Sequence, residues 1–308
     1  MNIITLTLNP AFDLHCDTDA FLPYHENVFE ITAKDAGGKG INVSRALTKN
    51  GVENLAVCIV GRENGAEFLE SLEAERLDVK AVYTEGRIRE NITLHEKKNP
   101  ETRISFKGFS ISDGKLAAVR EAMGEDLEGS VVVCAGSAPG GVSENSLVSF
   151  LRELKNEGAA LVIDSRSLSI EAIAALRPML IKPNKDEAGA ALGIRIESVE
   201  DGARAAQTLR EMGIENVLLS LGGDGAILAC ASGTYFAPAP KIEVLSTVGA
   251  GDSTLAGFLC AKAEGCEDEA LLIRAVAFGS AACMLAGTAA PRPEDIEKLE
   301  KQIAVKKL

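Results

Sequence analysis

Short apolar runs that alternate with helical patterns constrain the fold of this chain more than any other feature. The apolar runs have strand length and are mostly continuous: 3–8, 55–60, 131–135, 161–164, 179–181 and 217–221. Such runs are typical of strands that are covered on both faces. The intervening stretches have helical spacing: 66–75, 146–157, 199–212 and 269–286. This order predicts an α/β fold with a central, mostly parallel sheet flanked by helices and ligands bound at the carboxyl ends of its strands.

Two stretches, 12–34 and 91–109, interrupt this pattern. They contain short alternating segments, such as 28–32 and 92–95, which are typical of antiparallel strands. We expect the two stretches to form one small sheet, inserted in a single domain that spans residues 1–308. Because so small a sheet has no core of its own, we predict that it pairs with a second chain in a homodimer.

Composition limits the classes of partner. The chain has 308 residues and a net charge of −13, from 32 basic and 45 acidic side chains, which argues against binding to duplex nucleic acid or to an anionic membrane. No apolar run reaches the roughly 20 residues that span a bilayer. Seven cysteines, an odd number with no Cys-x-x-Cys pair, are typical of reduced core residues. We therefore expect a cytoplasmic protein.

The stretch 246–258 combines a glycine turn, an acidic residue and the start of a helix. Gly249 and Gly251 let the backbone turn without Cβ clashes, so that successive N–H groups can attract an anion at the helix N-terminus. Asp252 lies beside this predicted anion hole. It could simply cap the helix, with a low pKa, or it could act as a general base toward a substrate hydroxyl during phosphoryl transfer.

This stretch resembles the second signature of the ribokinase/PfkB carbohydrate kinase family, in which the aspartate of a Gly-Ala-Gly-Asp turn is the catalytic base. The resemblance implies a catalytic set of Asp252 with Gly249, Ala250 and Gly251. Four further segments agree with the family in the same order: 9–13, 35–47, 182–187 and 220–226. The resemblance runs from about residue 9 to residue 283. It implies a ribokinase-like fold in which the small sheet is a lid over the sugar and often the dimer contact.

On the sugar side, the resemblance and the residue types indicate eight substrate-binding residues: Asp13, Gly37, Gly38, Lys39, Asn42, Arg89, Arg103 and Ser137. Gly38 permits close backbone approach, and Asn42 can both donate and accept hydrogen bonds. Arg89 and Arg103 are candidates for binding a substrate phosphate, against the alternative of solvated surface charges. The three histidines fit no metal or triad spacing and are expected in the lid.

On the nucleotide side, the resemblance implies ATP-binding residues: Lys182, Asn184, Ser220, Gly222, Gly223, Gly225 and Ser280. It also implies that Glu187 helps to hold Mg²⁺ through water, which suits an ion that keeps several of its waters. Asn184 and Glu187 are equally suited to a helix cap, and Gly222 to Gly225 to a hairpin turn. The chain has neither a P-loop nor a strand-borne dinucleotide fingerprint.

These features predict an ATP- and Mg²⁺-dependent sugar-phosphate kinase, similar to the phosphosugar branch of the family. Fructose 1-phosphate, converted to fructose 1,6-bisphosphate, is the expected substrate, with tagatose 6-phosphate, fructose 6-phosphate or another sugar as alternatives. Segments 26–30 and 164–167 depart from the family pattern near the expected phosphate sites. A catalytically silent sugar-binding regulator is the alternative from another class, but Asp252 and its glycines are all present.

Overall fold

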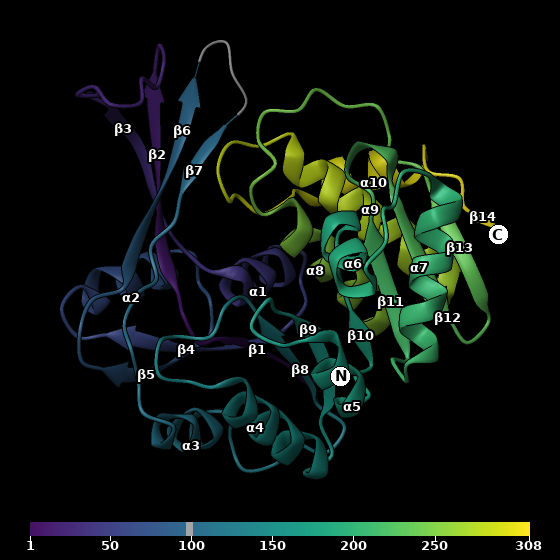
Figure 1. Cartoon of the computed structure of the whole chain (residues 1–308), viewed down its shortest axis with the longest axis horizontal. Helices are drawn as coiled ribbons and strands as arrows, with labels where there is room; N and C mark the ends of the chain where they lie inside the picture. The colour runs from purple at the N-terminus through teal and green to yellow at the C-terminus, as the bar shows by residue number, and fades with distance from the viewer. Residues whose placement is uncertain (97–100) are drawn as a thin grey trace.

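Two sheets organise the chain, of which the computed structural model describes residues 1–96 and 101–308 (Figure 1). The strands are β1 (Ile3–Thr7), β2 (Ala11–Thr18), β3 (Glu30–Gly37), β4 (Leu55–Gly61), β5 (Val79–Thr84), β6 (Arg89–Glu96), β7 (Thr102–Ile104), β8 (Val131–Ala135), β9 (Ala160–Asp164), β10 (Leu180–Ile181), β11 (Asn216–Ser220), β12 (Ala226–Cys230), β13 (Gly233–Ala237) and β14 (Lys306–Lys307). The helices are α1 (Lys39–Lys49), α2 (Gly65–Ala74), α3 (Gly114–Ala122), α4 (Glu144–Asn156), α5 (Ile170–Leu176), α6 (Lys185–Leu192), α7 (Val199–Glu211), α8 (Ala250–Ala263), α9 (Asp268–Cys283) and α10 (Pro293–Glu300).

The large sheet has ten strands in the order β14-β13-β12-β11-β10-β9-β8-β1-β4-β5. The strands from β5 to β11 in this order pair in parallel, and β12, β13 and β14 add an antiparallel edge. All six predicted strands are present with boundaries within one or two residues. The prediction of a mostly parallel α/β sheet is therefore confirmed.

Both faces of this sheet are buried, as the continuous apolar runs predict. Side chains that alternate along each strand enter two separate clusters. Ile4 belongs to the cluster that includes side chains of α2, α3, α4, α5 and α7, whereas Ile3 belongs to the cluster that includes side chains of α8, α9 and α10; α1 contributes to both. In β8, Val132 and Val133 divide between the two clusters in the same way. This double cover explains why a polar/apolar alternation is absent from the central strands.

The small sheet has the order β3-β2-β6-β7 and stands away from the large sheet, at the upper left of Figure 1. It brings together the two predicted lid stretches, although residues 97–100 of the second lie outside the described part of the chain. The pairs β2–β3 and β6–β7 are antiparallel, but the central pair β2–β6 is parallel. Sequence alternation cannot distinguish these cases, because side chains alternate in both.

The expectation of a single domain over 1–308 stays a prediction. In the described residues, no helix combines the length and the apolar character that crossing a membrane requires.

Candidate active site

The predicted base, Asp252, lies in the first turn of α8 and is 7% exposed. Gly249 is the N-cap residue of this helix, with a φ of 76° that favours glycine. Burial raises the pKa of Asp252 to about 6, and Asp164 adds to the rise, whereas Lys39, Lys182 and a hydrogen bond from Asn42 oppose it. The helix-cap alternative is wrong, because Gly249 is the N-cap and the helix start has no side-chain cap hydrogen bond. A pKa close to neutrality suits a general base.

Asn42 on α1 forms a hydrogen bond with Asp252. Its Nδ2 atom donates to Oδ2 of Asp252 over 2.8 Å, and its Oδ1 atom accepts from Nη1 of Arg45 over 2.9 Å. Arg45 is itself held by the Ala36 carbonyl and by Glu75. Because Arg45 fixes which end of the Asn42 amide faces Asp252, it positions a site residue without being part of the predicted set. The sequence signal that could have identified Arg45 is its spacing of three residues from Asn42, which places both side chains on the same face of a helix.

The diglycine turn brings the two predicted sugar contacts together. A Cβ atom on Gly37 would lie 3.2 Å from Oδ2 of Asp13 and 3.4 Å from Oδ1 of Asn42. Gly38 has a φ of 125°, and a Cβ there would lie 2.6 Å from Cγ2 of Thr7. Both glycines therefore allow a close approach that a side chain would block.

Asp13 on β2 accepts hydrogen bonds from two other strands of the small sheet. It is 3% exposed, and its Oδ1 atom accepts from Nδ2 of Asn91 and from Nη2 of Arg103, each over 3.0 Å. Arg103 comes from β7, so the two lid segments contribute to one cluster. Asp13 and Arg103, both in the predicted substrate-binding set, thus lie together.

Arg89 lies in a more constrained setting than the sequence suggested. Its guanidinium donates to three backbone carbonyl oxygens, those of Asn9 at 3.0 Å, Pro10 at 3.3 Å and Phe106 at 2.9 Å. Burial lowers the pKa of Arg89, with Asp13 opposing and Arg103 reinforcing that shift. Arg89 therefore links the start of β6 to the segment before β2 and to the segment after β7. Nearby, Oγ of Ser137 accepts from Nδ2 of Asn9 over 3.2 Å.

Asp164, at the end of β9, bridges two lysines and was not in the predicted site. Its Oδ1 atom lies 2.8 Å from Nζ of Lys39, and its Oδ2 atom lies 3.4 Å from Nζ of Lys182. Burial acts to raise the pKa of Asp164, but Lys182 and Lys39 outweigh it and lower the pKa. The signal available in the sequence was an acidic residue at the carboxyl end of a buried strand, where ligands bind in such sheets.

Lys182 also approaches the predicted anion hole. A Cβ atom on Gly251 would lie 3.1 Å from Nζ of Lys182, whose residue is 5% exposed. The ammonium group of Lys39 is likewise close enough to Asp252 and Asp164 for both carboxylates to raise its pKa, against the opposing effect of burial. Two ammonium groups thus border the N-terminus of α8, which is suited to anionic phosphate.

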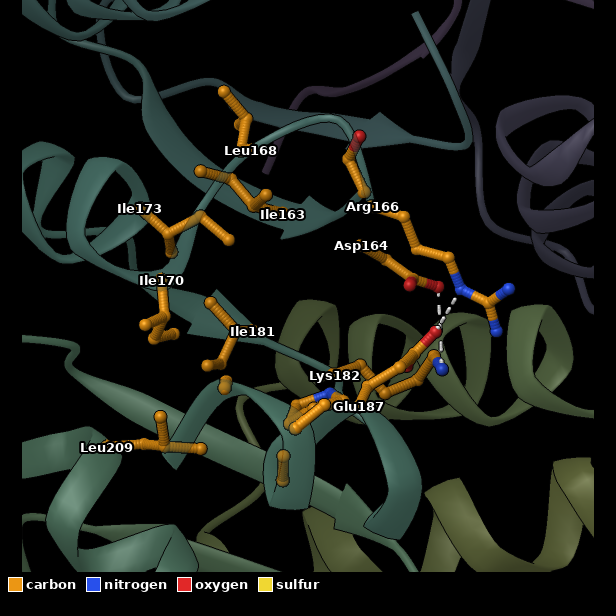
Figure 2. Close-up of a pocket in the computed structure, with 15 residues that line it drawn as sticks. Ile163, Asp164, Arg166, Leu168, Ile170, Ile173, Ile181, Lys182, Glu187 and Leu209 are labelled. Atoms are coloured by element: carbon orange, nitrogen blue, oxygen red, sulfur yellow. Dashed lines mark hydrogen bonds and ion pairs between the residues drawn. The ribbon is translucent and has the colours of Figure 1, made fainter. Parts of the chain in front are cut away.

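Asn184 and Glu187 form a capping box at the start of α6. The Asn184 Oδ1 atom accepts from Glu187 N over 2.8 Å, and Asn184 N donates to Glu187 Oε2 over 3.0 Å. The helix-cap alternative is therefore correct, and it leaves room for a second role. The Oε1 atom of Glu187 accepts from Nε of Arg166 over 2.6 Å, an ion pair that Figure 2 shows beside Asp164 and Lys182.

The predicted nucleotide loop is a tight hairpin between β11 and β12. A 3-10 turn covers Gly222–Asp224, Gly222 has a φ of 64° and Gly225 has a φ of 118°. Ser220, at the end of β11, forms an isolated bridge with Asn184. This part of the structure therefore brings the predicted metal and nucleotide segments side by side. Ser280 is buried on α9, and its neighbour Gly279 packs against Thr254 of α8.

The lid also contains an unpredicted pair of histidines. Nδ1 of His15 lies 3.0 Å from Nε2 of His95, and Nε2 of His15 lies 3.5 Å from Oδ2 of Asp35. The same carboxylate oxygen accepts from Oγ1 of Thr288 over 3.2 Å. The placement of both histidines in the lid strands agrees with the sequence prediction, and Asp35 connects them to the turn that follows α9.

A cavity of about 260 Å³ opens beside the Arg166–Glu187 pair. Figure 2 shows aliphatic side chains, including Ile163, Ile173 and Ile181, on one side of it and the charged groups on the other. Asp252 does not line this cavity.

The described residues contain no group of three or more His, Cys, Asp or Glu side chains that could hold a metal ion. Glu187 is a half-buried carboxylate whose two oxygens accept from Asn184 N and from Arg166 Nε. A single carboxylate of this kind fits an Mg²⁺ ion that is held mainly by nucleotide phosphates and water.

This geometry is that of an α/β fold with a buried carboxylate at a glycine-turned helix N-terminus, two ammonium groups close to it and a second, small sheet, an arrangement suited to phosphoryl transfer. The pfkB family carbohydrate kinase profile matches residues 9–295, so the chain belongs to that family. It is 36% identical over 257 residues to 1-phosphofructokinase of Bacillus subtilis, covering 83% of this chain and 84% of the relative. It is 32% identical over 311 residues to tagatose-6-phosphate kinase of Staphylococcus epidermidis, covering 98% and 99%.

Among solved structures, phosphofructokinase-2 of Escherichia coli in complex with substrates and products superimposes with a TM-score of 0.91 at 28% identity, covering 98% of this chain and 99% of that one. A tetrameric inhibited form of the same protein has a TM-score of 0.89 at 27% identity, covering 98% of each chain.

Proposed function

We propose that the protein transfers the γ-phosphoryl group of ATP to fructose 1-phosphate, giving fructose 1,6-bisphosphate and ADP. The observation that carries this proposal is the buried Asp252, which combines a pKa of about 6 with a direct hydrogen bond from Asn42 at the start of the helix α8. The catalytically silent alternative would not require a carboxylate with these properties. Relatives named 1-phosphofructokinase support the choice of substrate.

In the proposed reaction, Asp252 accepts the proton of the sugar hydroxyl as its oxygen forms a bond to the γ-phosphorus. The bond between that phosphorus and the bridging oxygen breaks, and ADP leaves. The N–H groups of the 249–251 turn and the Lys182 ammonium group stabilise the negative charge on the transferred group. Mg²⁺ that is bound with the nucleotide would neutralise phosphate charge, with Glu187 and Asn184 orienting its waters.

Asp13, Gly37, Gly38 and Asn42 would bind the sugar hydroxyls. Arg103 and Arg89 would face the substrate phosphate, and Ser137 and Lys39 would also contact the substrate. Because Arg89 already donates to three carbonyls, we propose that it places the phosphate pocket and that Arg103, whose side chain is 45% exposed, makes the more direct contact. On the nucleotide side, Ser220, Gly222, Gly223, Gly225 and Ser280 would line the ATP site.

Tagatose 6-phosphate is the second candidate substrate, because a tagatose-6-phosphate kinase relative is 32% identical and matches 98% of this chain. ADP release should be measured over fructose 1-phosphate, fructose 6-phosphate, tagatose 6-phosphate and free fructose. The highest kcat/KM is expected for fructose 1-phosphate. A clear preference for free fructose would contradict a site that binds a substrate phosphate.

We further propose a cytoplasmic homodimer in which the lid sheets of two chains cover each other. All seven cysteines are free, as in a reducing compartment. Strand β3 is an edge of the lid, and Ile31 on it is 61% exposed. Ile31→Glu should weaken the dimer in sedimentation experiments. The control is Ile194→Glu, which changes an exposed isoleucine outside the small sheet. A wild-type monomer at micromolar concentration would contradict the proposal.

A further inference from the structure

Both carboxylate oxygens of Glu187 are already engaged. Oε2 accepts from the backbone N–H of Asn184 over 3.0 Å, which completes the capping box of α6. Oε1 accepts from Nε of Arg166 over 2.6 Å. The capping bond belongs to the helix and is retained as long as α6 keeps its first turn. A metal-bound water can therefore gain an oxygen of Glu187 most readily where Arg166 is displaced.

Arg166 has little to hold it in this position. It lies in the loop between β9 and α5, and its side chain is 76% exposed, compared with 24% for that of Glu187. Within the described residues, its Nη1 and Nη2 groups have no hydrogen-bond partner in the structure. An exposed ion pair with a single contact contributes little to stability and exchanges easily. Arg166 thus has unbonded N–H donors, and its one ion pair can be broken at little cost.

The surroundings make Arg166 responsive to an added anion. Three basic groups, Lys39, Lys182 and Arg166, lie close to three carboxylates, those of Asp164, Asp252 and Glu187. Lys39 and Lys182 are both committed to Asp164, which is buried. Arg166 is therefore the basic group here that can move toward a nucleotide phosphate at the smallest cost in broken contacts. A guanidinium offers such a phosphate two parallel hydrogen bonds.

We propose that the Arg166 side chain has two positions. In the nucleotide-free protein it pairs with the Glu187 carboxylate, and when the nucleotide binds it moves to a phosphate, which frees Glu187 for the metal. This inference rests on the proposed function, because it requires that Glu187 faces the metal. It adds a nucleotide-binding residue outside the predicted set and makes metal access depend on the nucleotide.

The test uses Arg166→Ala in the full chain, with Arg195→Ala as the matched control. Arg195 is also an exposed arginine paired with one glutamate, at 3.5 Å from Glu197. In the nucleotide-free protein, Arg166→Ala should bind Mn²⁺ about three- to fivefold more tightly than wild type, as measured by electron paramagnetic resonance. The same variant should bind metal-free ADP about tenfold more weakly, as measured by calorimetry. Arg195→Ala should change neither affinity.

Two results would overturn the inference: an Mn²⁺ affinity in Arg166→Ala that is equal to or below that of wild type, or an unchanged affinity for metal-free ADP. Glu187→Gln separates this failure from failure of the proposed function. If Glu187→Gln binds Mn²⁺ as tightly as wild type with ADP present, when Arg166 should have left Glu187, both the metal assignment and the inference are wrong. If Glu187→Gln loses Mn²⁺ affinity with ADP present but Arg166→Ala gains none in the nucleotide-free protein, the metal assignment stands and only the proposed movement of Arg166 is wrong. Arg166→Lys should keep the ion pair with Glu187 but bind ADP more weakly than wild type, because a lysine cannot donate two parallel hydrogen bonds to a phosphate.

Discussion

The Asn42 side-chain amide donates to the Asp252 carboxylate over 2.8 Å, across 210 residues of chain. This bond joins the helix of the first glycine turn to the helix of the second. It also holds one oxygen of the predicted base, so that the other is available to a substrate hydroxyl. The bond favours the charged form of Asp252 and opposes the rise in pKa that burial causes.

The pH dependence of catalysis should report on Asp252. Because its pKa is raised to about 6, the carboxyl group is protonated below that pH and cannot accept a proton. We expect kcat/KM to fall as the pH drops through about 6 and to be flat above it. Asp252→Asn should lower kcat by roughly 10²–10⁴-fold at all pH values, with substrate affinity nearly unchanged. A variant that retains a third of wild-type turnover would exclude the base assignment.

Removal of the Asn42 amide should shift this profile in a defined direction. The hydrogen bond from Asn42 lowers the pKa of Asp252, so Asn42→Ala should move the acid limb of the pH–rate profile to higher pH. Arg45→Gln should cause a smaller shift of the same sign, because it loosens the amide that Arg45 orients. Arg120→Gln, which changes another arginine bonded to a glutamate, is the control. An unchanged acid limb in Asn42→Ala would show that the bond does not affect the base.

Asp164 should contribute strongly to stability. In Asp164→Asn, the ammonium group of Lys182, whose side chain is 6% exposed, loses its buried counter-charge. A loss of about 3 kcal/mol in the free energy of unfolding is expected near pH 7, measured by urea denaturation. Asp295→Asn, at an exposed pair with Lys298, should cost far less. Because the pKa of Asp164 is lowered, its stabilisation is present above the ordinary value of 3.8 and is lost as the pH falls through the folded pKa.

The buried His15 should remain charged to a higher pH than a free histidine. The carboxylate of Asp35, 3.5 Å from Nε2 of His15, raises the pKa of His15 above 6.5, against burial, and Asp13 and Glu101 reinforce the rise. The associated stabilisation is full below pH 6.5 and is lost as the pH rises through the folded pKa. Asp35→Asn should lower the pKa of His15 in an NMR titration, whereas Asp17→Asn, an exposed change on the same strand, should not. Equal titration of His15 in wild type and Asp35→Asn would contradict the pairing.

Local sequence was sufficient for the main elements of fold and site. The strands of the large sheet were predictable because continuous apolar runs are needed wherever helices cover both faces. The glycine turn before Asp252 and the capping box of Asn184 and Glu187 were predictable for a similar reason. Each depends on backbone angles and hydrogen bonds within a few neighbouring residues.

The tertiary structure alone decided how these pieces act on one another. Asp164 holds Lys39 from 125 residues away, and Arg89 uses its donors on carbonyls that lie 17 to 80 residues away. The pKa of Asp252 rises because the packed chain removes water from its carboxylate, which no local pattern encodes. The pairing of Arg166 with Glu187 likewise depends on the loop after β9 meeting the first turn of α6. Sequence therefore determined which chemical groups are present, whereas burial and long-range contacts determined their charge, their orientation and their availability.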